Sequence, residues 1–183
     1  GPNMEIFTRA AACFKDRFDT LPIIAEDMGI LTDSVIALVE KSGFPSMKVL
    51  EFAFDSDNKN FYLPHNYPRN CVAYTGTHDN TTLAAWIKGQ SPHVRSFMQR
   101  YMGGIYTPEE ELYWDCIRML LRSVADTVII PMQDYLGLPE YARLNSPGVG
   151  EGNWRFRLKP GEVTTALLEK MGELAYLYAR KGQ

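Results

Sequence analysis

The chain has 183 residues, 45% of them hydrophobic and 22% charged, and its formal net charge is −3. This length and balance are typical of one soluble globular domain, and the weak acidic charge predicts no nucleic-acid partner. No apolar run approaches the roughly 20 residues that span a bilayer, so we expect no membrane partner. Residues 1–3 resemble an expression scar, and we expect the native domain at residues 4–183.

The three cysteines (Cys13, Cys71 and Cys116) are widely spaced and odd in number. This pattern predicts free thiols in a reducing compartment such as the cytoplasm. The three histidines show no spacing typical of metal ligands. We therefore expect no metal and no organic cofactor.

In the first half of the chain, two predicted helices each precede a predicted strand. The helices span residues 4–17 and about 32–43, and the second begins with helix-capping residues and stops at a glycine. The strands span residues 21–25 and 47–54, and long apolar stretches of this kind are typical of parallel strands covered on both faces. A polar loop at 55–70 follows, and loops of this length tend to be functional.

The second half continues the alternation of strands and helices. Its predicted elements are strand 71–75, helices 81–88, 92–101 and 108–124, strand 127–131, a loop at 137–153 and a helix at 162–180. Strands that alternate with helices predict an α/β fold with a parallel sheet.

Three of the four predicted strands end in polar residues. These endings are Glu26-Asp27, His78-Asp79-Asn80 and Gln133-Asp134. In a β/α barrel the chemistry lies at the C-terminal ends of the strands. We therefore expect these side chains to meet at one mouth.

Glu26 directly follows an apolar run, so we expect its carboxyl to be partly desolvated. Desolvation raises the pKa of a carboxyl group and suits it to donate a proton. The alternative is a structural carboxylate that caps the next helix or pairs with an arginine, and the residues alone favour neither.

Asp79 follows a Thr-Gly-Thr turn, in which Gly76 permits an unusual backbone conformation. The polar cluster around Asp79 could hydrogen-bond a substrate. The alternative is an ordinary helix N-cap, which spacing alone favours.

Two carboxylates at the same end of neighbouring strands fit glycoside chemistry. That chemistry needs an acid to protonate the leaving oxygen and a carboxylate to face the developing oxocarbenium ion. Aromatic side chains in the loops could form platforms for sugar rings or simply pack in the core. They are Phe54, Phe61, Tyr62, Tyr67 and Trp154.

Seven segments carry a more specific signal because they occur in a fixed order. They are IAEDMG at 24–29, KVLEFAF at 48–54, LPHNY at 63–67, YTGTHDN at 74–80, PMQD at 131–134, ARLNSPG at 142–148 and GNWRFR at 152–157. Together they resemble the C-terminal part of the 4-α-glucanotransferases (amylomaltase or disproportionating enzyme) of glycoside hydrolase family 77.

The resemblance implies the C-terminal half of a (β/α)8 TIM barrel, strands five to eight, with parallel strands and flanking helices. It also implies a retaining transferase that moves α-1,4-glucan segments between glucans, with malto-oligosaccharides as partners. Such carbohydrate metabolism takes place in the cytoplasm, or in a plastid if the source is a plant.

The resemblance also implies residue roles. Glu26 matches the general acid/base at the end of strand five, and Asp79 matches the transition-state stabiliser at the end of strand seven. His78 matches a histidine that binds sugar hydroxyls. The other implied substrate-binding positions are Phe52, Phe54, Asp55 and Asn145.

One family feature is missing, namely the aspartate nucleophile in an Arg-Ile-Asp-His-like stretch on strand four. Asp16 and Asp19 precede the first predicted strand and do not match it. We therefore expect a fragment that is inactive by itself and whose open half-barrel pairs with a second copy as a dimer. The alternative is a non-catalytic α-glucan-binding module.

Overall fold

The computed structural model describes residues 2–29 and 32–180, so residue 1 of the expected scar lies outside the described residues. A three-stranded parallel sheet runs through the middle of the chain in the order β1-β2-β3. The strands are β1 (Ser46–Val49), β2 (Cys71–Tyr74) and β3 (Thr127–Ile129). Three α-helices lie between β2 and β3, whereas the chain between β1 and β2 contains only two short 3-10 turns. Parallel strands with flanking helices confirm the predicted α/β class.

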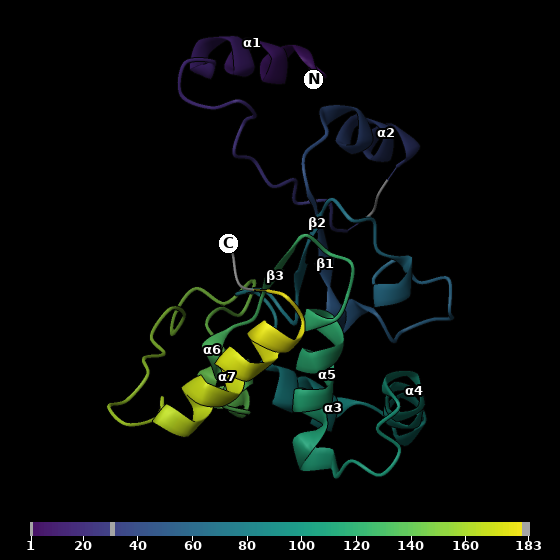
Figure 1. Cartoon of the computed structure of the whole chain (residues 1–183), viewed down its shortest axis with the longest axis vertical. Coiled ribbons are helices and arrows are strands. Elements are labelled where there is room, and N and C mark those ends of the chain that lie inside the picture. The colour runs from purple at the N-terminus through teal and green to yellow at the C-terminus, as the bar shows by residue number, and fades with distance from the viewer. Residues whose placement is uncertain (1, 30–31, 181–183) are drawn as a thin grey trace.

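The described part of the chain contains seven α-helices. They are α1 (Glu5–Phe14), α2 (Asp33–Ser42), α3 (Leu83–Gly89), α4 (Pro92–Met102), α5 (Leu112–Leu121), α6 (Met132–Tyr135) and α7 (Thr165–Leu177). In Figure 1, α3 to α7 gather at one end of the molecule, whereas α1 and α2 lie at the other. Among residues 2–29 and 32–180, no helix is long and apolar enough to cross a membrane.

The core is built around α5. Seven of its ten residues are buried, and it contacts α3, α4, α6 and α7. The buried residues are Leu112, Trp114, Cys116, Ile117, Met119, Leu120 and Leu121. By contrast, α1 and α2 have no buried residue. The main buried core therefore draws its residues from between Leu50 and Leu174.

The strand predicted at 21–25 does not form as a strand. Ala25 makes one isolated parallel bridge to Ser46, and the Ile23 amide turns back to the Leu21 carbonyl at 2.9 Å. Ile24 remains 47% exposed. A proline at position 22 also supplies no amide proton for a ladder. The segment nevertheless runs beside the start of β1.

The strand predicted at 47–54 ends early. The chain leaves the sheet after Val49 and enters a 3-10 turn at Leu50–Phe52. This turn sends Phe54 into the core, where its ring packs edge-on against Phe97 and Tyr101. The change of direction brings Glu51 behind the end of β2.

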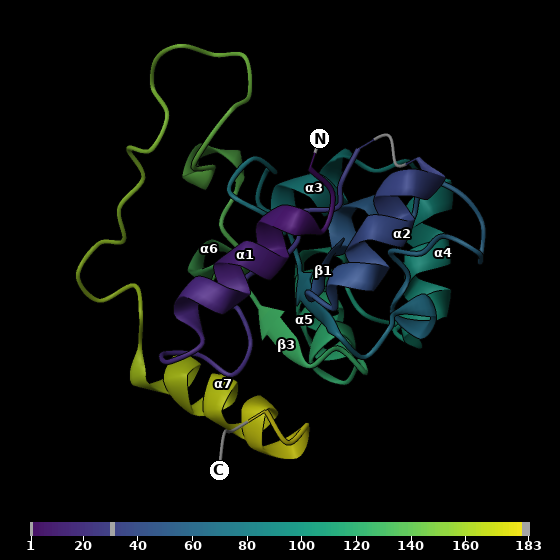
Figure 2. The ribbon, with the colours of Figure 1, turned by 90° about the horizontal axis from the view of Figure 1, so that it is seen from above.

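Between α6 and α7, residues 136–164 form a long excursion. It contains only one short 3-10 turn, Glu140–Ala142. Figure 2 shows this segment extending away from the helices before it returns to α7. Its first part reaches back to the end of β2, where it contributes to the site described next.

Candidate functional site

An open pocket lies where β1, β2 and β3 end. Its volume is about 510 Å³, and its lining includes Glu26, Phe52, His78 and Asp79. These residues come from three different parts of the sequence that the parallel sheet brings to one edge. The expectation from the polar strand ends is met in part, because Glu26 and His78-Asp79-Asn80 line this pocket, whereas Asp27, Gln133 and Asp134 do not.

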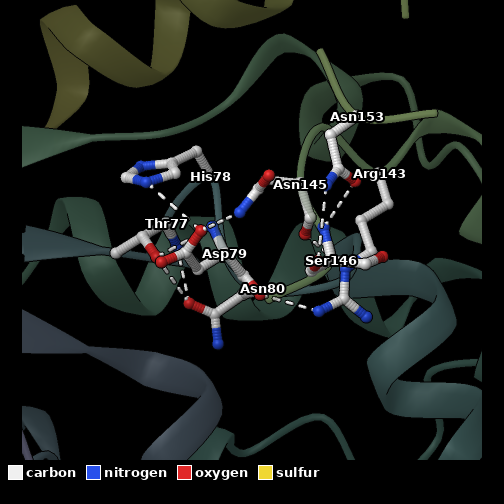
Figure 3. A network of polar contacts seen from close by, with 8 residues as sticks. All are labelled: Thr77, His78, Asp79, Asn80, Arg143, Asn145, Ser146 and Asn153. Carbon is white, nitrogen blue, oxygen red and sulfur yellow. Dashed lines mark hydrogen bonds and ion pairs between the residues drawn. The ribbon is translucent and has the colours of Figure 1, made fainter. Parts of the chain in front are cut away.

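Asp79 is held by neighbours on either side while its carboxylate remains accessible. The Asn145 side-chain amide donates to Asp79 Oδ1 at 2.6 Å, and His78 Nε2 lies 3.2 Å from the same oxygen. Arg143 Nη2 donates to the Asp79 carbonyl at 2.7 Å. Figure 3 shows these contacts converging from the two segments. The Asp79 side chain is 48% exposed, so a ligand can still reach it.

The loop that carries Asn145 is fastened to the turn at residues 77–80. The Asn145 amide donates to the His78 carbonyl at 3.1 Å, and Arg143 Nε donates to the Asn145 carbonyl at 2.8 Å. Further along, the Ser146 amide donates to Asn153 Oδ1 at 2.9 Å. These bonds fix the position of Asn145 relative to Asp79.

Trp154 lies beside His78, with the two ring centroids 5.1 Å apart and the planes inclined by 33°. Its side chain is 53% exposed, and its backbone φ of 64° is unusual for a bulky residue. A half-exposed indole that is strained into place suits contact with a ligand. Of the loop aromatics, Phe54, Tyr62 and Tyr67 are instead buried, as packing predicts.

The turn that carries Asp79 is closed by Asn80. Asn80 Oδ1 accepts hydrogen bonds from the Thr77 amide at 2.9 Å and the Thr77 hydroxyl at 2.8 Å. The next helix, α3, is capped by the Thr82 side chain, which accepts from the Ala85 amide. The N-cap interpretation of Asp79 is therefore wrong.

Gly76 has a different role from the one predicted. Its φ does not lie in the left-handed region, so no unusual backbone conformation explains it. Instead, a Cβ at this position would lie 2.9 Å from Glu51 Oε1 and 3.1 Å from Asn80 Cβ. Close packing, not backbone freedom, requires glycine here.

Glu26 lies on the pocket wall and is exposed. The desolvation predicted for it is absent, because the segment before it makes only one bridge to the sheet. The cap position of α2 is Thr32, so Glu26 does not cap that helix. Its position depends on its neighbour, since Asp27 accepts from the Met47 amide at 2.7 Å.

The remaining predicted positions divide between the pocket and other places. Phe52 lines the pocket, is 37% exposed and packs edge-on against Tyr62. Asp55 is exposed in the following loop, where it accepts from the Asn60 side-chain amide at 2.8 Å. Phe54 is 3% exposed, which leaves no surface for a glucan to contact.

Two buried carboxyl groups, those of Asp134 and Glu51, lie behind the pocket. Only Asp134 belongs to one of the predicted polar strand ends. Asp134 accepts from the Thr75 hydroxyl at 2.5 Å and from the Leu83 amide at 2.8 Å. Burial raises the pKa of Asp134 to about 6, against the effect of these two donors. Burial also raises the pKa of Glu51 to about 8, and the negative charge of Asp134 adds to this increase.

Sequence reasoning missed Glu51 and Arg143 as site residues, and it named Trp154 only as one of five loop aromatics that could contact sugar rings or pack in the core. Glu51 interrupts the otherwise apolar run between Leu50 and Phe52, which is a signal that could have been used. The contacts of Arg143 and Trp154 depend on the path of a long loop. Within the described ranges, no cluster of three or more His, Cys, Asp or Glu side chains could hold a metal ion.

Comparison with known proteins gives the same family as the ordered segments. The family model described as 4-alpha-glucanotransferase matches residues 3–164. The chain belongs to the 4-alpha-glucanotransferase family. Within that family, a 4-alpha-glucanotransferase of Thermus thermophilus is 45% identical over 152 residues, which are 80% of this chain and 30% of that protein.

A second relative and a solved structure extend the match over nearly the whole chain. The 4-alpha-glucanotransferase of Clostridium butyricum is 40% identical over 182 residues, which cover 98% of this chain and 36% of that protein. The amylomaltase of Streptococcus agalactiae, solved with acarbose, superposes with a TM-score of 0.89 at 33% identity. That likeness covers 100% of this chain and 36% of the amylomaltase. The chain therefore spans about a third of the length of these family members and has the fold of one portion of the amylomaltase barrel.

Proposed function

We propose that this chain supplies the acid/base and the transition-state-stabilising part of the active site of a retaining 4-α-glucanotransferase. The observation that supports this most strongly is that Glu26, His78 and Asp79 line one pocket at the ends of parallel strands. The substrates proposed are α-1,4-glucans and malto-oligosaccharides, and the enzyme would belong to glycogen, starch or maltose metabolism.

Each side chain has a role that its geometry can perform. Glu26 is exposed to the pocket, where its carboxyl can protonate the glycosidic oxygen of the leaving glucan. Asp79 presents a fixed, accessible carboxylate to the positive charge that develops on the sugar ring. The other Asp79 neighbour, His78, is half-exposed and can bind sugar hydroxyls.

Three further side chains would hold the glucan. Phe52 offers an apolar wall, and Trp154 offers a half-exposed ring next to His78. Asn145 orients Asp79 and keeps its position through the loop bonds. Asp55 is proposed to contact longer glucans, because its loop follows Phe52 directly and is exposed.

We also propose that residues 1–183 bind glucans without transferring them. Retention of configuration needs a carboxylate nucleophile in addition to the acid. Among the described residues that line this pocket, the carboxylates are Glu26 and Asp79, and both already have roles. The alternative of a pure glucan-binding module predicts the same binding, so the two proposals differ in whether a complete enzyme needs these carboxylates for turnover.

Titration of the chain with acarbose, followed by calorimetry, tests the proposed site. We expect measurable binding that Asp79→Ala abolishes and that Trp154→Ala weakens by about threefold to tenfold, as loss of one ring contact should. Tyr176→Ala is the matched control, because Tyr176 is 77% exposed on α7. Equal affinity in all four proteins would contradict the proposal.

The chain is proposed to self-associate as a dimer. The N-terminal part exposes several large apolar side chains on α1, α2 and the segment between them, and such clusters mark interaction surfaces. They are Ile6, Phe14, Phe18, Ile24, Val35 and Ile36. Light scattering should give twice the chain mass, and replacement of Phe14 and Phe18 by serine should give the monomer.

The proposed location is the cytoplasm, or a plastid in a plant. The support is that Cys71 and Cys116 are buried free thiols and Cys13 is an exposed free thiol. Thiols in these states persist in reducing compartments. A relative from Arabidopsis thaliana, 39% identical over 164 residues, is named as chloroplastic/amyloplastic.

A further inference from the structure

A buried carboxyl group supports the pocket from behind, and it belongs to Glu51 in the 3-10 turn after β1. Glu51 is 7% exposed. Its amide donates to the Thr75 carbonyl at 3.2 Å, and its Oε2 accepts from the Asn80 side-chain amide at 3.1 Å. Glu51 therefore contacts both the end of β2 and the turn that presents His78 and Asp79.

The second oxygen of Glu51 fits tightly against the same turn. Oε1 is buried and has no hydrogen-bond partner among the described residues. It faces Gly76, where even a Cβ would lie only 2.9 Å away. A buried acid with one free oxygen is tolerated far better when it is neutral than when it is ionised. The geometry therefore favours a neutral Glu51.

The charged groups around Glu51 act in both directions. Asp134, from α6, and Glu140, from the 3-10 turn at 140–142, disfavour its negative charge. Arg143 and the hydrogen bond from Asn80 favour the charge, but burial is the largest effect and raises the pKa to about 8. Glu51 is thus neutral at pH 7 and ionises in the mildly alkaline range.

We propose that Glu51 is a positioning residue that holds the turn at 77–80, and with it His78 and Asp79, while it is neutral and releases the turn when it ionises. Ionisation spreads negative charge over both oxygens, including the unpartnered Oε1, and the charge of Asp134 opposes it. One neutral amide donor from Asn80 does not replace the lost hydration of that charge. Water must enter or the two turns must separate, and either change disturbs Asp79.

NMR of the full chain tests this without any glucan. The signals to follow are the Thr77 backbone amide and the Asn80 side-chain amide, from about pH 6.5 to about pH 9.5. In the wild-type chain both should shift with a midpoint near the Glu51 pKa of about 8. Glu51→Gln keeps a neutral acceptor for Asn80, so its signals should stay constant, whereas the control Glu169→Gln on the exposed surface of α7 should behave as wild type.

Wild-type signals that do not shift over this range would overturn the inference, even if the variant fails to fold. A transition that persists in Glu51→Gln would also overturn it, because another group would then be titrating. The link to function rests on the proposed glucan site, so acarbose affinity is measured separately. It should fall across the same transition in the wild type and remain constant in Glu51→Gln.

These two measurements fail independently. If acarbose binds at no pH, the proposed function is wrong, yet the NMR titration still decides whether Glu51 controls the turn. If acarbose affinity is constant while the turn titrates, Glu51 does not position the glucan-binding groups and the inference is wrong.

Discussion

At the scale of single residues, the Asp79 carboxylate is oriented by groups from distant segments. The Asn145 side chain and the His78 ring both meet Oδ1, and Arg143 meets the Asp79 carbonyl. Hydrogen bonds of this kind each contribute only about 0.5–1.5 kcal/mol to stability. Their main effect is to reduce the freedom of Asp79 before a ligand arrives, which lowers the cost of binding.

Gly76→Ala tests the close packing behind this carboxylate. The added methyl group would meet Glu51 Oε1 and Asn80 Cβ, so we expect a loss of about 1–3 kcal/mol in the free energy of unfolding. The control is Gly150→Ala, since no atom lies within 4 Å of a Cβ there. Urea unfolding measures both, and an equal effect of the two substitutions would refute the packing argument.

The sequence predicted which residues lie at the candidate site more readily than it predicted the contacts that surround them. Glu26, His78 and Asp79 were located because polar residues follow apolar strands and match ordered family segments. The reason given for Gly76 was wrong, because its neighbour Glu51 is 25 positions away and comes from another strand end. Phe54 was misplaced because the chain leaves the sheet at Val49, which no periodicity announces.

At the scale of elements, the segment that carries Glu26 depends on one buried ion pair more than on strand pairing. Asp27 Oδ2 lies 3.6 Å from Lys48 Nζ, and Asp27 Oδ1 accepts from the Met47 amide. Both charged side chains are buried, at 10% and 8% exposure. The ammonium group of Lys48 also lies 5.2 Å from the Phe61 ring centroid. These contacts hold the segment beside β1, as ladder hydrogen bonds would hold a strand.

Asp27→Asn should therefore destabilise the fold and loosen Glu26. Asparagine can still accept from the Met47 amide, but it leaves Lys48 buried without its counter-ion, which typically costs about 3–5 kcal/mol. Hydrogen exchange at residues 25–27 and 47–48 should accelerate. Adding Lys48→Met should recover most of the loss, because the unpaired charge is then removed.

The exposed pair of Arg9 and Glu5 on α1 serves as the control for this experiment. Its two side chains are 78% and 60% exposed, so Glu5→Gln should change stability by less than about 1 kcal/mol. If Asp27→Asn were as mild as Glu5→Gln, the buried pair would not be what positions Glu26.

At the scale of the whole molecule, the sequence predicted the class of fold but not the number and length of its strands. The alternation of elements predicted parallel strands, and the structure has them. Helices join β2 to β3, whereas only two short 3-10 turns lie between β1 and β2. The strand predicted at residues 21–25 does not form, although the apolar run with Ile23 and Ile24 has the composition of a strand. In the described residues, its only ladder contact is the Ala25 bridge. Pairing is a tertiary property that local composition does not determine.

Stability should fall as pH rises from about 4.5 to about 8. The pKa of Glu51 is raised from 4.5 to about 8 in the folded chain, so the unfolded chain loses this proton first and the folded state binds more protons in this window. The stabilisation that comes from the Glu51 proton is complete below about pH 4.5 and is lost as pH passes 8. Its upper bound is about 5 kcal/mol in the free energy of unfolding. Asp134, whose pKa is raised to about 6, adds a loss of the same sign at lower pH.

Urea unfolding at about pH 6 and about pH 8 measures this dependence. The wild-type chain should lose roughly 3 kcal/mol between these values, and Glu51→Gln should lose much less. A Glu51→Gln variant with the wild-type slope would show that the proton is bound elsewhere.

The central claim is that Glu26 and Asp79 act together in glucan transfer, and turnover by a complete barrel tests it most directly. The chain would replace the matching 36% of the Streptococcus agalactiae amylomaltase, and disproportionation of maltotriose would be measured. Glu26→Gln and Asp79→Asn should each reduce the rate by roughly a thousandfold. Asp126→Asn, which changes an exposed carboxylate paired with Arg69, should leave it unchanged. A chimera that transfers glucan at its full rate with either pocket carboxylate replaced would contradict the account.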